Sequence, residues 1–472
     1  MSKKISCISP IDNRIIAERE IISDSEIVEL IHAANNAQNT WSELNIAEKA
    51  VLCHQAIDAL LENTQEIAQE ISLQMGRPIQ FCAAELQVMA QRARYMIDVA
   101  QPALDTISIE NTNSKKRLIK RIALGVVFII APWNYPYLTA INAIIPALMA
   151  GNTVILKHST QTLLCSERFH LAFEQAGLPS NVFQYCHCDH QTTEKIIKHE
   201  GIHYISFTGS ISGGATIENS IAGLFKPLAL ELGGNDPAYV RADVEPRSEM
   251  FKQTVDNIVD GCFFNSGQSC CAVERIYVHE HLYSEFTDYF IEKVKQYNIA
   301  NPLDNDTSLG PLINDNAATK ARQQLSQAIS KGATACIAKN YFNTEDLAKN
   351  YLAPQVLLNV DHSMDIMMSE SFAPIVGIMK VKNDQQALEL MNDSQYGLTA
   401  SLWSNDENNS MLLADKLQTG TVFLNRCDYL DPALAWVGVK NSGRGCALSV
   451  LAYQQLTRPK SYYFQSLKPS VD

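Results

Sequence analysis

The stretch GVVFIIAPW, residues 125–133, decides the fold class of this chain. It is an apolar run without the polar alternation of a half-exposed strand, and strands buried on both faces of a parallel sheet have this character. The longer apolar segment around it, residues 122–133, is well short of the roughly 20 residues that a membrane helix requires. We therefore interpret the run as a buried strand and expect no association with a membrane.

Strand-like and helix-like segments alternate beyond this run, which favours parallel sheets wound with helices. NTVILKHS (152–159), HYISFTGS (203–210) and PLALELGG (227–234) are each followed or preceded by a helical stretch. RIYVHE (275–280) and PIVGIMK (374–380) continue the pattern in the second half of the chain. Ligands of such sheets bind at the carboxyl ends of the strands, so the residues that follow these strands are the candidates for a site.

The residues that precede the run are predicted to be largely helical. Ser23 and Glu26 have the spacing of a capping box at a helix start. Helical periodicity continues over about residues 47–75 and 83–100. Residues 117–122 then alternate in polarity, as a half-exposed strand does.

The composition limits the class of protein. A chain of 472 residues is long enough for two or three domains, and its 46% hydrophobic and 19% charged residues are typical of a globular protein. The 51 acidic and 38 basic residues give a net charge of −13, which argues against a nucleic-acid partner. The 12 cysteines lack the spacing of a disulfide framework, and MSKKISCISP lacks the apolar core of an export signal. We therefore expect reduced thiols and a cytoplasmic location.

The segment CHCDH, residues 186–190, brings two cysteines and two histidines together. Zinc sites usually take such ligands in spaced pairs, with a second pair elsewhere in the chain. The sequence offers no matching second pair. We interpret the segment as a loop after a strand and expect no metal.

Four motifs that are weak singly are informative together. They are PWNYP (132–136), FTGS (207–210), LELGG (230–234) and GQSC (267–270). The glycine-rich GSISGG alone is not the dinucleotide-binding fingerprint. In this order the motifs resemble the aldehyde dehydrogenase superfamily, and LKHS (156–159) resembles its succinate semialdehyde dehydrogenase-like subgroup. The resemblance covers nearly the whole chain and continues through SESFAP (369–374), NDSQYGL (392–398), GTVFLN (420–425) and GVKNSGRG (438–445).

The resemblance implies an α/β fold of the aldehyde dehydrogenase type. A Rossmann-like cofactor domain, residues 1–104 and 125–233, is expected beside an α/β catalytic domain, residues 234–444. A small β element for oligomerisation, residues 105–124 and 456–472, is expected to pair with another subunit. A homodimer or homotetramer is therefore expected.

The resemblance also implies the chemistry. Cys270 would attack a small-molecule aldehyde, and the resulting thiohemiacetal would be oxidised to a thioester. Asn134 and the backbone N–H of Cys270 would stabilise the oxyanion, and Glu231 would act as the general base that activates water. The presence of Glu231 favours hydrolysis to a free carboxylate. The adjacent Cys271 is expected to face away as a packing residue, because neighbouring side chains of an extended segment point to opposite sides.

The cofactor residues that the resemblance implies are Trp133, Lys157, Gly209, Ser210, Gly214, Glu370 and Phe372. Lys157 is expected at the adenine-side ribose, and Glu370 with Phe372 at the nicotinamide ribose and ring. Thr160 stands where NAD-selective members often have a glutamate. A threonine removes the repulsion of a 2′-phosphate but adds no cation, so NAD is favoured and NADP is tolerated.

The substrate-pocket residues expected are Tyr135, Thr139, Asn142 and Trp436. Asn142 stands where succinate semialdehyde dehydrogenases have an arginine for the distal carboxylate, so this lining favours an uncharged or hydroxylated aldehyde. Arg426 is an alternative source of a cation. A succinate semialdehyde dehydrogenase therefore remains an alternative to an aldehyde dehydrogenase of another specificity. A thiol hydrolase and a non-catalytic structural protein with this fold are the alternatives from other classes.

Overall fold

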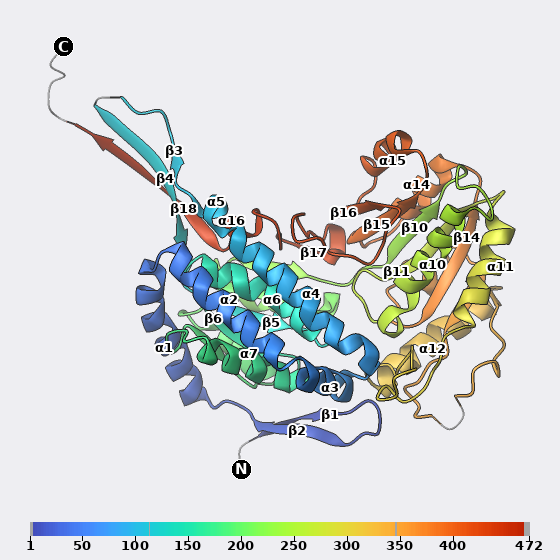
Figure 1. Ribbon diagram of the computed structural model, residues 1–472, viewed down its shortest axis with the longest axis horizontal. Coiled ribbons are helices and arrows are strands. Elements are labelled where there is room, and N and C mark those ends of the chain that lie inside the picture. The colour runs from blue at the N-terminus through green and yellow to red at the C-terminus, as the bar shows by residue number, and fades with distance from the viewer. Residues whose placement is uncertain (1–2, 113, 345–346, 467–472) are drawn as a thin grey trace.

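The computed structural model describes residues 3–112, 114–344 and 347–466. Two lobes lie side by side, each built on a mainly parallel sheet with helices on both faces, and a narrow β arm projects from the first lobe (Figure 1). This arrangement confirms the predicted α/β fold class. Among the described residues, no helix is long and apolar enough to cross a membrane.

The first lobe contains a six-stranded sheet in which only β17 is antiparallel. Its order is β17 (Gly443–Arg444), β9 (Leu228–Glu231), β8 (Tyr204–Thr208), β5 (Val126–Ala131), β6 (Thr153–His158) and β7 (Phe183–Tyr185). Every residue of β5 and of β6 is buried, which explains the unbroken apolar run of the sequence.

Helices cover both faces of this sheet. They are α1 (Asp24–Glu43), α2 (Ile46–Glu62), α3 (Thr64–Met75), α4 (Ile79–Asp98), α5 (Ala100–Leu104), α6 (Pro136–Met149), α7 (Leu163–Gln175), α8 (His190–Lys198), α9 (Ile211–Ile221) and α16 (Ala452–Gln455). Helices α2, α4, α6 and α7 share one hydrophobic core, and α1, α8 and α9 share the core on the opposite face. The predicted capping box is confirmed, because Ser23 and Glu26 cap the start of α1 reciprocally.

The second lobe contains a seven-stranded sheet that is parallel except for its edge strand β12. Its order is β12 (Thr334–Ala335), β13 (Gln355–Leu358), β14 (Ile375–Val381), β11 (Val273–His279), β10 (Asp236–Val240), β15 (Thr399–Trp403) and β16 (Thr421–Leu424). Its helices are α10 (Glu249–Phe263), α11 (Tyr283–Val294), α12 (Asp315–Ser330), α13 (Asp365–Met368), α14 (Asp384–Asn392) and α15 (Glu407–Ala414). Helices α10 and α11 pack on one face of the sheet, and α12 to α14 pack on the other.

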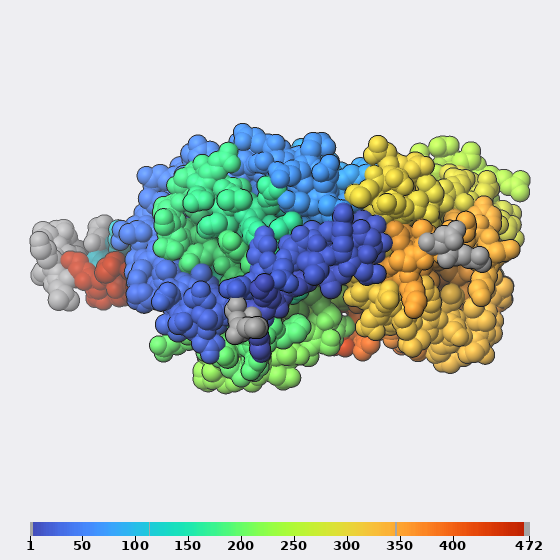
Figure 2. Space-filling view, turned by 90° about the horizontal axis from the view of Figure 1, so that it is seen from below, coloured from blue at the N-terminus to red at the C-terminus, as the bar shows by residue number. Residues whose placement is uncertain are grey.

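The N-terminal region differs from the sequence expectation. An antiparallel hairpin, β1 (Lys4–Ile8) and β2 (Ile15–Glu20), precedes the helices. In the view from below, the blue N-terminal segment crosses from the first lobe to the second (Figure 2). There the carbonyl of Pro10 accepts a hydrogen bond of 2.7 Å from Asn350 of the second lobe. The hairpin is too short for a hydrophobic period to reveal it, and its position depends on contacts with both lobes.

The β arm consists of β3 (Ile107–Ser108), β4 (Lys115–Ala123) and β18 (Thr457–Gln465). Strands β4 and β18 are antiparallel and pair from Thr457 opposite Ala123 to Gln465 opposite Lys115. No residue of β4 is fully buried, which agrees with the half-exposed strand predicted for residues 117–122. Residues 467–472 of the expected oligomerisation element lie outside the described part of the chain.

Candidate active site

A cavity of about 610 Å³ lies where the two lobes meet. The three residues expected to be catalytic, Asn134, Glu231 and Cys270, all line it. Asn134 follows β5, Glu231 ends β9, and Cys270 lies in the connection between α10 and β11. Two of the three thus stand at the carboxyl ends of parallel strands, where ligands of such sheets bind.

The backbone before Cys270 reverses direction sharply. Helix α10 ends at Phe263, and Asn265 (φ 54°) and Ser266 (φ 57°) adopt left-handed conformations that non-glycine residues rarely take. The Asn265 side chain holds the reversal by donating to the carbonyls of Asn134 and Gln268, both at 3.2 Å. Cys270 then lies in a turn before β11 and is partly exposed to the cavity.

The expectation that Cys271 faces away is wrong, because this segment is a turn and not extended. Cys271 is 2% exposed and borders the same cavity as Cys270. Its thiol donates to the carboxylate of Asp428 at 3.0 Å, and the Ser269 hydroxyl donates to the same oxygen at 2.7 Å. Hydrogen bonding with the Cys270 side chain, burial and the charge of Asp428 raise the pKa of Cys271 well above its usual range. Cys271 therefore stays a protonated thiol near neutral pH.

Asn134 is held by partners that the sequence did not indicate. Its side-chain amide donates to the carbonyl of Gln268 at 3.2 Å, and the residue is 5% exposed. Its backbone carbonyl accepts from the guanidinium of Arg77, a buried side chain that also donates to Asn265 at 3.1 Å. Arg77 thus ties the Asn134 turn to the loop that carries Cys270.

Arg77 is paired with Glu85 of α4, which is also buried. The other oxygen of Glu85 accepts the backbone N–H groups of Tyr137 and Leu138, at 2.8 and 3.1 Å, in the first turn of α6. A carboxylate at a helix N-terminus satisfies donors that have no partner within the helix. The ion pair therefore fixes the start of α6 together with the Asn134 turn.

The Glu231 carboxyl group lies in an environment that raises its affinity for a proton. One of its oxygens is buried without a hydrogen-bond partner. Burial raises its pKa to about 8, and a hydrogen bond with the Trp436 side chain lowers it in part. A base with a pKa near the working pH transfers protons efficiently. Trp436, expected only as a pocket wall, thus also contacts Glu231.

A second buried carboxyl group, that of Glu370, faces the cavity beside Phe372. Burial and the neighbouring Glu274 raise the pKa of Glu370 to about 8, and one of its oxygens has no hydrogen-bond partner. The Phe372 ring lies 5.7 Å from that of Trp133, edge to face. Glu274, which the sequence did not single out, holds this loop by accepting the N–H of Phe372 at 2.8 Å and that of Ser371 at 2.9 Å.

The glycine-rich turn at the start of α9 leaves no room for side chains. A Cβ atom at Gly209 would lie 2.7 Å from the Phe207 ring, and one at Gly214 would lie 2.7 Å from the Leu232 side chain. Ser210 caps the helix by accepting the Gly213 N–H at 3.1 Å.

These features fit a dinucleotide. A backbone that can be approached closely at a helix N-terminus suits a pyrophosphate, and the unpartnered oxygen of Glu370 suits a ribose hydroxyl. Lys157 is the penultimate residue of the buried strand β6, and Thr160 begins the short helical turn Thr160–Thr162 that follows.

The expected substrate-pocket residues Tyr135, Thr139, Asn142 and Trp436 all line the cavity. The Thr139 hydroxyl donates to the Tyr135 carbonyl at 2.7 Å, so it is already engaged. The expectation of a lining without a cation is not met, because Arg92 of α4 also borders the cavity. Arg426 borders it too, with its guanidinium 3.7 Å from the centre of the Tyr429 ring.

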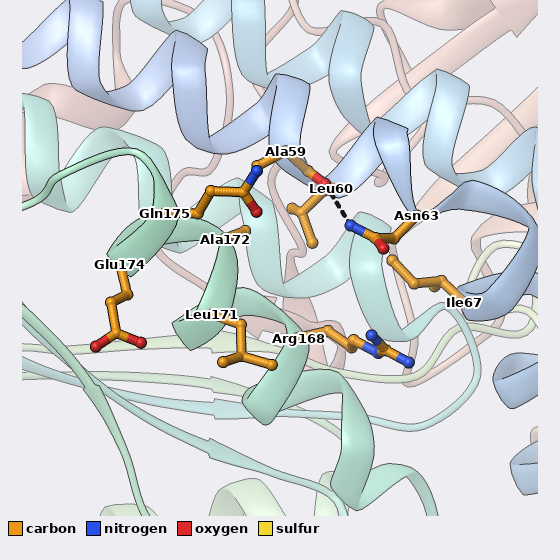
Figure 3. Close-up of a pocket in the computed structure, with 9 residues that line it drawn as sticks. All are labelled: Ala59, Leu60, Asn63, Ile67, Arg168, Leu171, Ala172, Glu174 and Gln175. Carbon is orange, nitrogen blue, oxygen red and sulfur yellow. Dashed lines mark hydrogen bonds between the residues drawn. The ribbon is translucent and has the colours of Figure 1, made fainter.

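Two other features of the molecule lie away from this site. A hollow between α2, α3 and α7 contains Arg168 (Figure 3). The guanidinium of Arg168 is paired with Glu66 at 2.6 Å and with Glu70 at 2.5 Å. Residues 186–189 of the segment CHCDH form the connection between β7 and α8, and His190 is the first residue of α8. In the described part of the chain, no group of three or more His, Cys, Asp or Glu residues is arranged to hold a metal ion.

The family and the relatives of this chain show an NAD(P)-dependent oxidoreductase that acts on aldehydes, and the two-lobed fold with a thiol in its cavity agrees with this. The chain belongs to the aldehyde dehydrogenase family, whose family model matches residues 1–462.

Individual relatives differ in their substrates. The chain is 31% identical over 409 residues to the NAD(P)+ succinate semialdehyde dehydrogenase Sad of Escherichia coli, which covers 87% of each chain. It is 31% identical over 477 residues to the peroxisomal aminoaldehyde dehydrogenase 1 of Pisum sativum, covering 97% of this chain and 93% of the relative. The crystal structure of the NADP-dependent glyceraldehyde-3-phosphate dehydrogenase of Bacillus halodurans, complexed with NADP, superposes with a TM-score of 0.91 at 29% identity. That superposition covers 98% of this chain and 96% of the other.

Proposed function

We propose that this enzyme oxidises an aldehyde to a free carboxylate through a covalent intermediate on Cys270. The observation that supports this most directly is the convergence of Cys270, Asn134 and Glu231 on one cavity that also contains Glu370 and Phe372. A structural protein has no need of this set, and a thiol hydrolase has no need of the last two. When bound, the oxidised nicotinamide supplies the acceptor for the hydride.

The first step is attack of the Cys270 thiolate on the aldehyde carbonyl. The backbone N–H of Cys270 and the side-chain amide of Asn134 donate to the developing oxyanion, and Asn134 is already held against the cysteine loop through Gln268. The neutral amide donates without transferring a proton. Loss of hydride from the thiohemiacetal leaves a thioester on Cys270.

The second step is hydrolysis of the thioester. Glu231 takes a proton from a water molecule, which attacks the acyl carbon and releases the carboxylate product and the Cys270 thiolate. The unpartnered oxygen of Glu231 is available to accept that proton. Cys271 is not a second nucleophile, because its thiol is engaged with Asp428.

The cofactor is held by Trp133, Lys157, Gly209, Ser210, Gly214, Glu370 and Phe372 in this proposal. NAD is favoured over NADP because no cation is expected beside Thr160 to pair with a 2′-phosphate. The reaction is tested by mixing the protein with an aldehyde and either dinucleotide and following absorbance at about 340 nm. No reduction of either dinucleotide over a panel of aldehydes, by folded protein, would refute the proposal.

We also propose a division into a cofactor domain, a catalytic domain and the β arm at the residues expected from the sequence. The arm is proposed to pair with another subunit in a homodimer or homotetramer. It projects from the first lobe (Figure 1), and the side chains of Tyr463 and Phe464 are each 57% exposed there. Light scattering after gel filtration tests this, since a monomer at micromolar concentration would contradict it. A cytoplasmic location is proposed because all 12 cysteines are free thiols.

A further inference from the structure

Arg92 is a buried cation that the reaction described above does not use. It lies in α4, is 5% exposed and borders the active-site cavity. Its Nη1 atom donates to the carbonyl of Leu138 at 3.2 Å and to the side-chain carbonyl of Asn142 at 3.1 Å, both on α6. Its Nε atom is buried and has no hydrogen-bond partner.

A buried guanidinium without a counter-ion is energetically unfavourable. Burial of a charge without a counter-ion loses hydration that only paired or hydrogen-bonding groups can replace. Among the described residues, no carboxylate lies within 4.0 Å of Arg92. Burial accordingly lowers the pKa of Arg92 to about 10, against the opposite influence of the Cys271, Cys270, Glu85 and Tyr429 side chains.

Arg77, a buried arginine near the same site, differs from Arg92 because it has a counter-ion. Arg77 has the carboxylate of Glu85, the Asn265 side chain and the Asn134 carbonyl as partners. None of the described carboxylates that border the cavity forms an ion pair with Arg92 within 4.0 Å. Asp428 accepts from Ser269 and Cys271.

Asn142 has a specific role toward Arg92. Its side-chain carbonyl and the backbone carbonyl of Leu138 both accept hydrogen bonds from Nη1 of Arg92. These two bonds fix the orientation of the planar guanidinium. The Nε atom of the guanidinium has no hydrogen-bond partner within the described part of the protein, and the residue borders the cavity. The neutral residue that suggested an uncharged pocket therefore positions a cation from another helix.

We propose that Arg92 binds an anionic group, a carboxylate, at the end of the substrate remote from the aldehyde. The substrate class is then an aldehyde that carries a second, carboxylate end. A planar carboxylate matches the fork geometry of a guanidinium and supplies the missing counter-ion. The inference rests on the proposed function of the same cavity and adds the substrate class to it.

Succinate semialdehyde and butanal have the same number of carbon atoms and differ in the terminal carboxylate, so they form the test pair. The wild type is expected to have the higher kcat/KM for succinate semialdehyde. Arg92→Met, which keeps an unbranched side chain, is expected to lower kcat/KM for succinate semialdehyde on the order of 100-fold and to leave that for butanal within several-fold. Arg92→Lys keeps the charge without the fork and is expected to fall between the two.

Variants of two further arginines test whether Arg92, and not another arginine, binds the remote carboxylate. Arg168→Met changes a paired guanidinium in the hollow of Figure 3, outside the site, and is expected to leave the preference between the aldehydes unchanged. If Arg426→Met abolishes the preference and Arg92→Met does not, the anchor is Arg426 and the proposal is overturned. Equal losses for both aldehydes in Arg92→Met and Arg92→Lys would likewise overturn it, since they indicate a structural role.

Equilibrium binding decides the same question without turnover. Succinate and butyrate both have the carboxylate that the reaction would produce, and only succinate has the remote one. Calorimetry with the wild type is expected to show tighter binding of succinate, and Arg92→Met is expected to remove the difference. If no aldehyde of a panel reduces NAD or NADP, the proposed function fails, while this binding difference still supports or overturns the role of Arg92.

Discussion

Glu231→Gln is expected to separate the two halves of the reaction. Glutamine is similar in size but cannot accept the proton of the water, so Cys270 still forms the thioester and hydrolysis becomes slow. Rapid mixing is expected to show reduction of up to about one cofactor per active site, followed by a steady rate lower by a factor on the order of 10²–10⁴. Mass spectrometry is expected to find the acyl group on the peptide that contains Cys270.

The environment of Glu231 also sets the expected pH dependence. Burial raises the pKa of this carboxyl to about 8, above its ordinary value, so the basic form is lost as the pH falls through that value. A group with this pKa is about one-tenth ionised at pH 7 and about nine-tenths ionised at pH 9, so the hydrolysis rate should rise about tenfold between them. Single-turnover decay of the thioester, measured at several pH values, tests this directly.

The comparison with the variant makes the test decisive. The pH-dependent rise should be absent in Glu231→Gln, whose amide does not titrate in this range. A wild-type burst alone is not diagnostic, because slow release of the cofactor also produces one. Normal steady-state turnover in Glu231→Gln, or the same pH profile in both proteins, would refute the assignment of Glu231 as the base.

The other predictions concern the thiols, the cofactor and the support of the oxyanion site. Cys270→Ala should abolish aldehyde oxidation while Cys271→Ala keeps most of it; equal losses in two folded variants would mean that the thiols are wrongly assigned. Thr160→Glu should lower kcat/KM with NADP relative to NAD about tenfold or more, by adding a carboxylate beside the 2′ position; an unchanged ratio would place Thr160 away from the ribose. Arg77→Met should leave Glu85 as an unpaired buried charge and lower the free energy of unfolding by about 3–5 kcal/mol. If a denaturant titration shows that Arg77→Met lowers the free energy of unfolding by less than about 1 kcal/mol, the Arg77–Glu85 pair is not important for stability.

Local sequence was enough for the elements and motifs that carry their own signal. The apolar run in β5 identified a strand buried on both faces, and Ser23 with Glu26 identified the start of α1. Asn134, Glu231 and Cys270 could be selected because each lies in a short motif, and the motifs occur in a recognisable order. These features can be predicted from the sequence because strand burial and helix capping depend on residues close together in the chain.

The tertiary structure alone decided which side chains meet in the cavity and how their charges are balanced. Arg92 is separated by 50 residues from Asn142, and Arg77 by 188 residues from Asn265, so no local period links either pair. An arginine in an amphipathic helix ordinarily lies on the solvated face, and the pattern of α4 does not distinguish it from one that turns inward. The orientation of Cys271 was mispredicted for a related reason, because residues 270 and 271 form a turn before β11 and not an extended segment. The pKa of Glu231 likewise follows from burial, since desolvation is a property of the assembled cavity and not of the residues beside it in sequence.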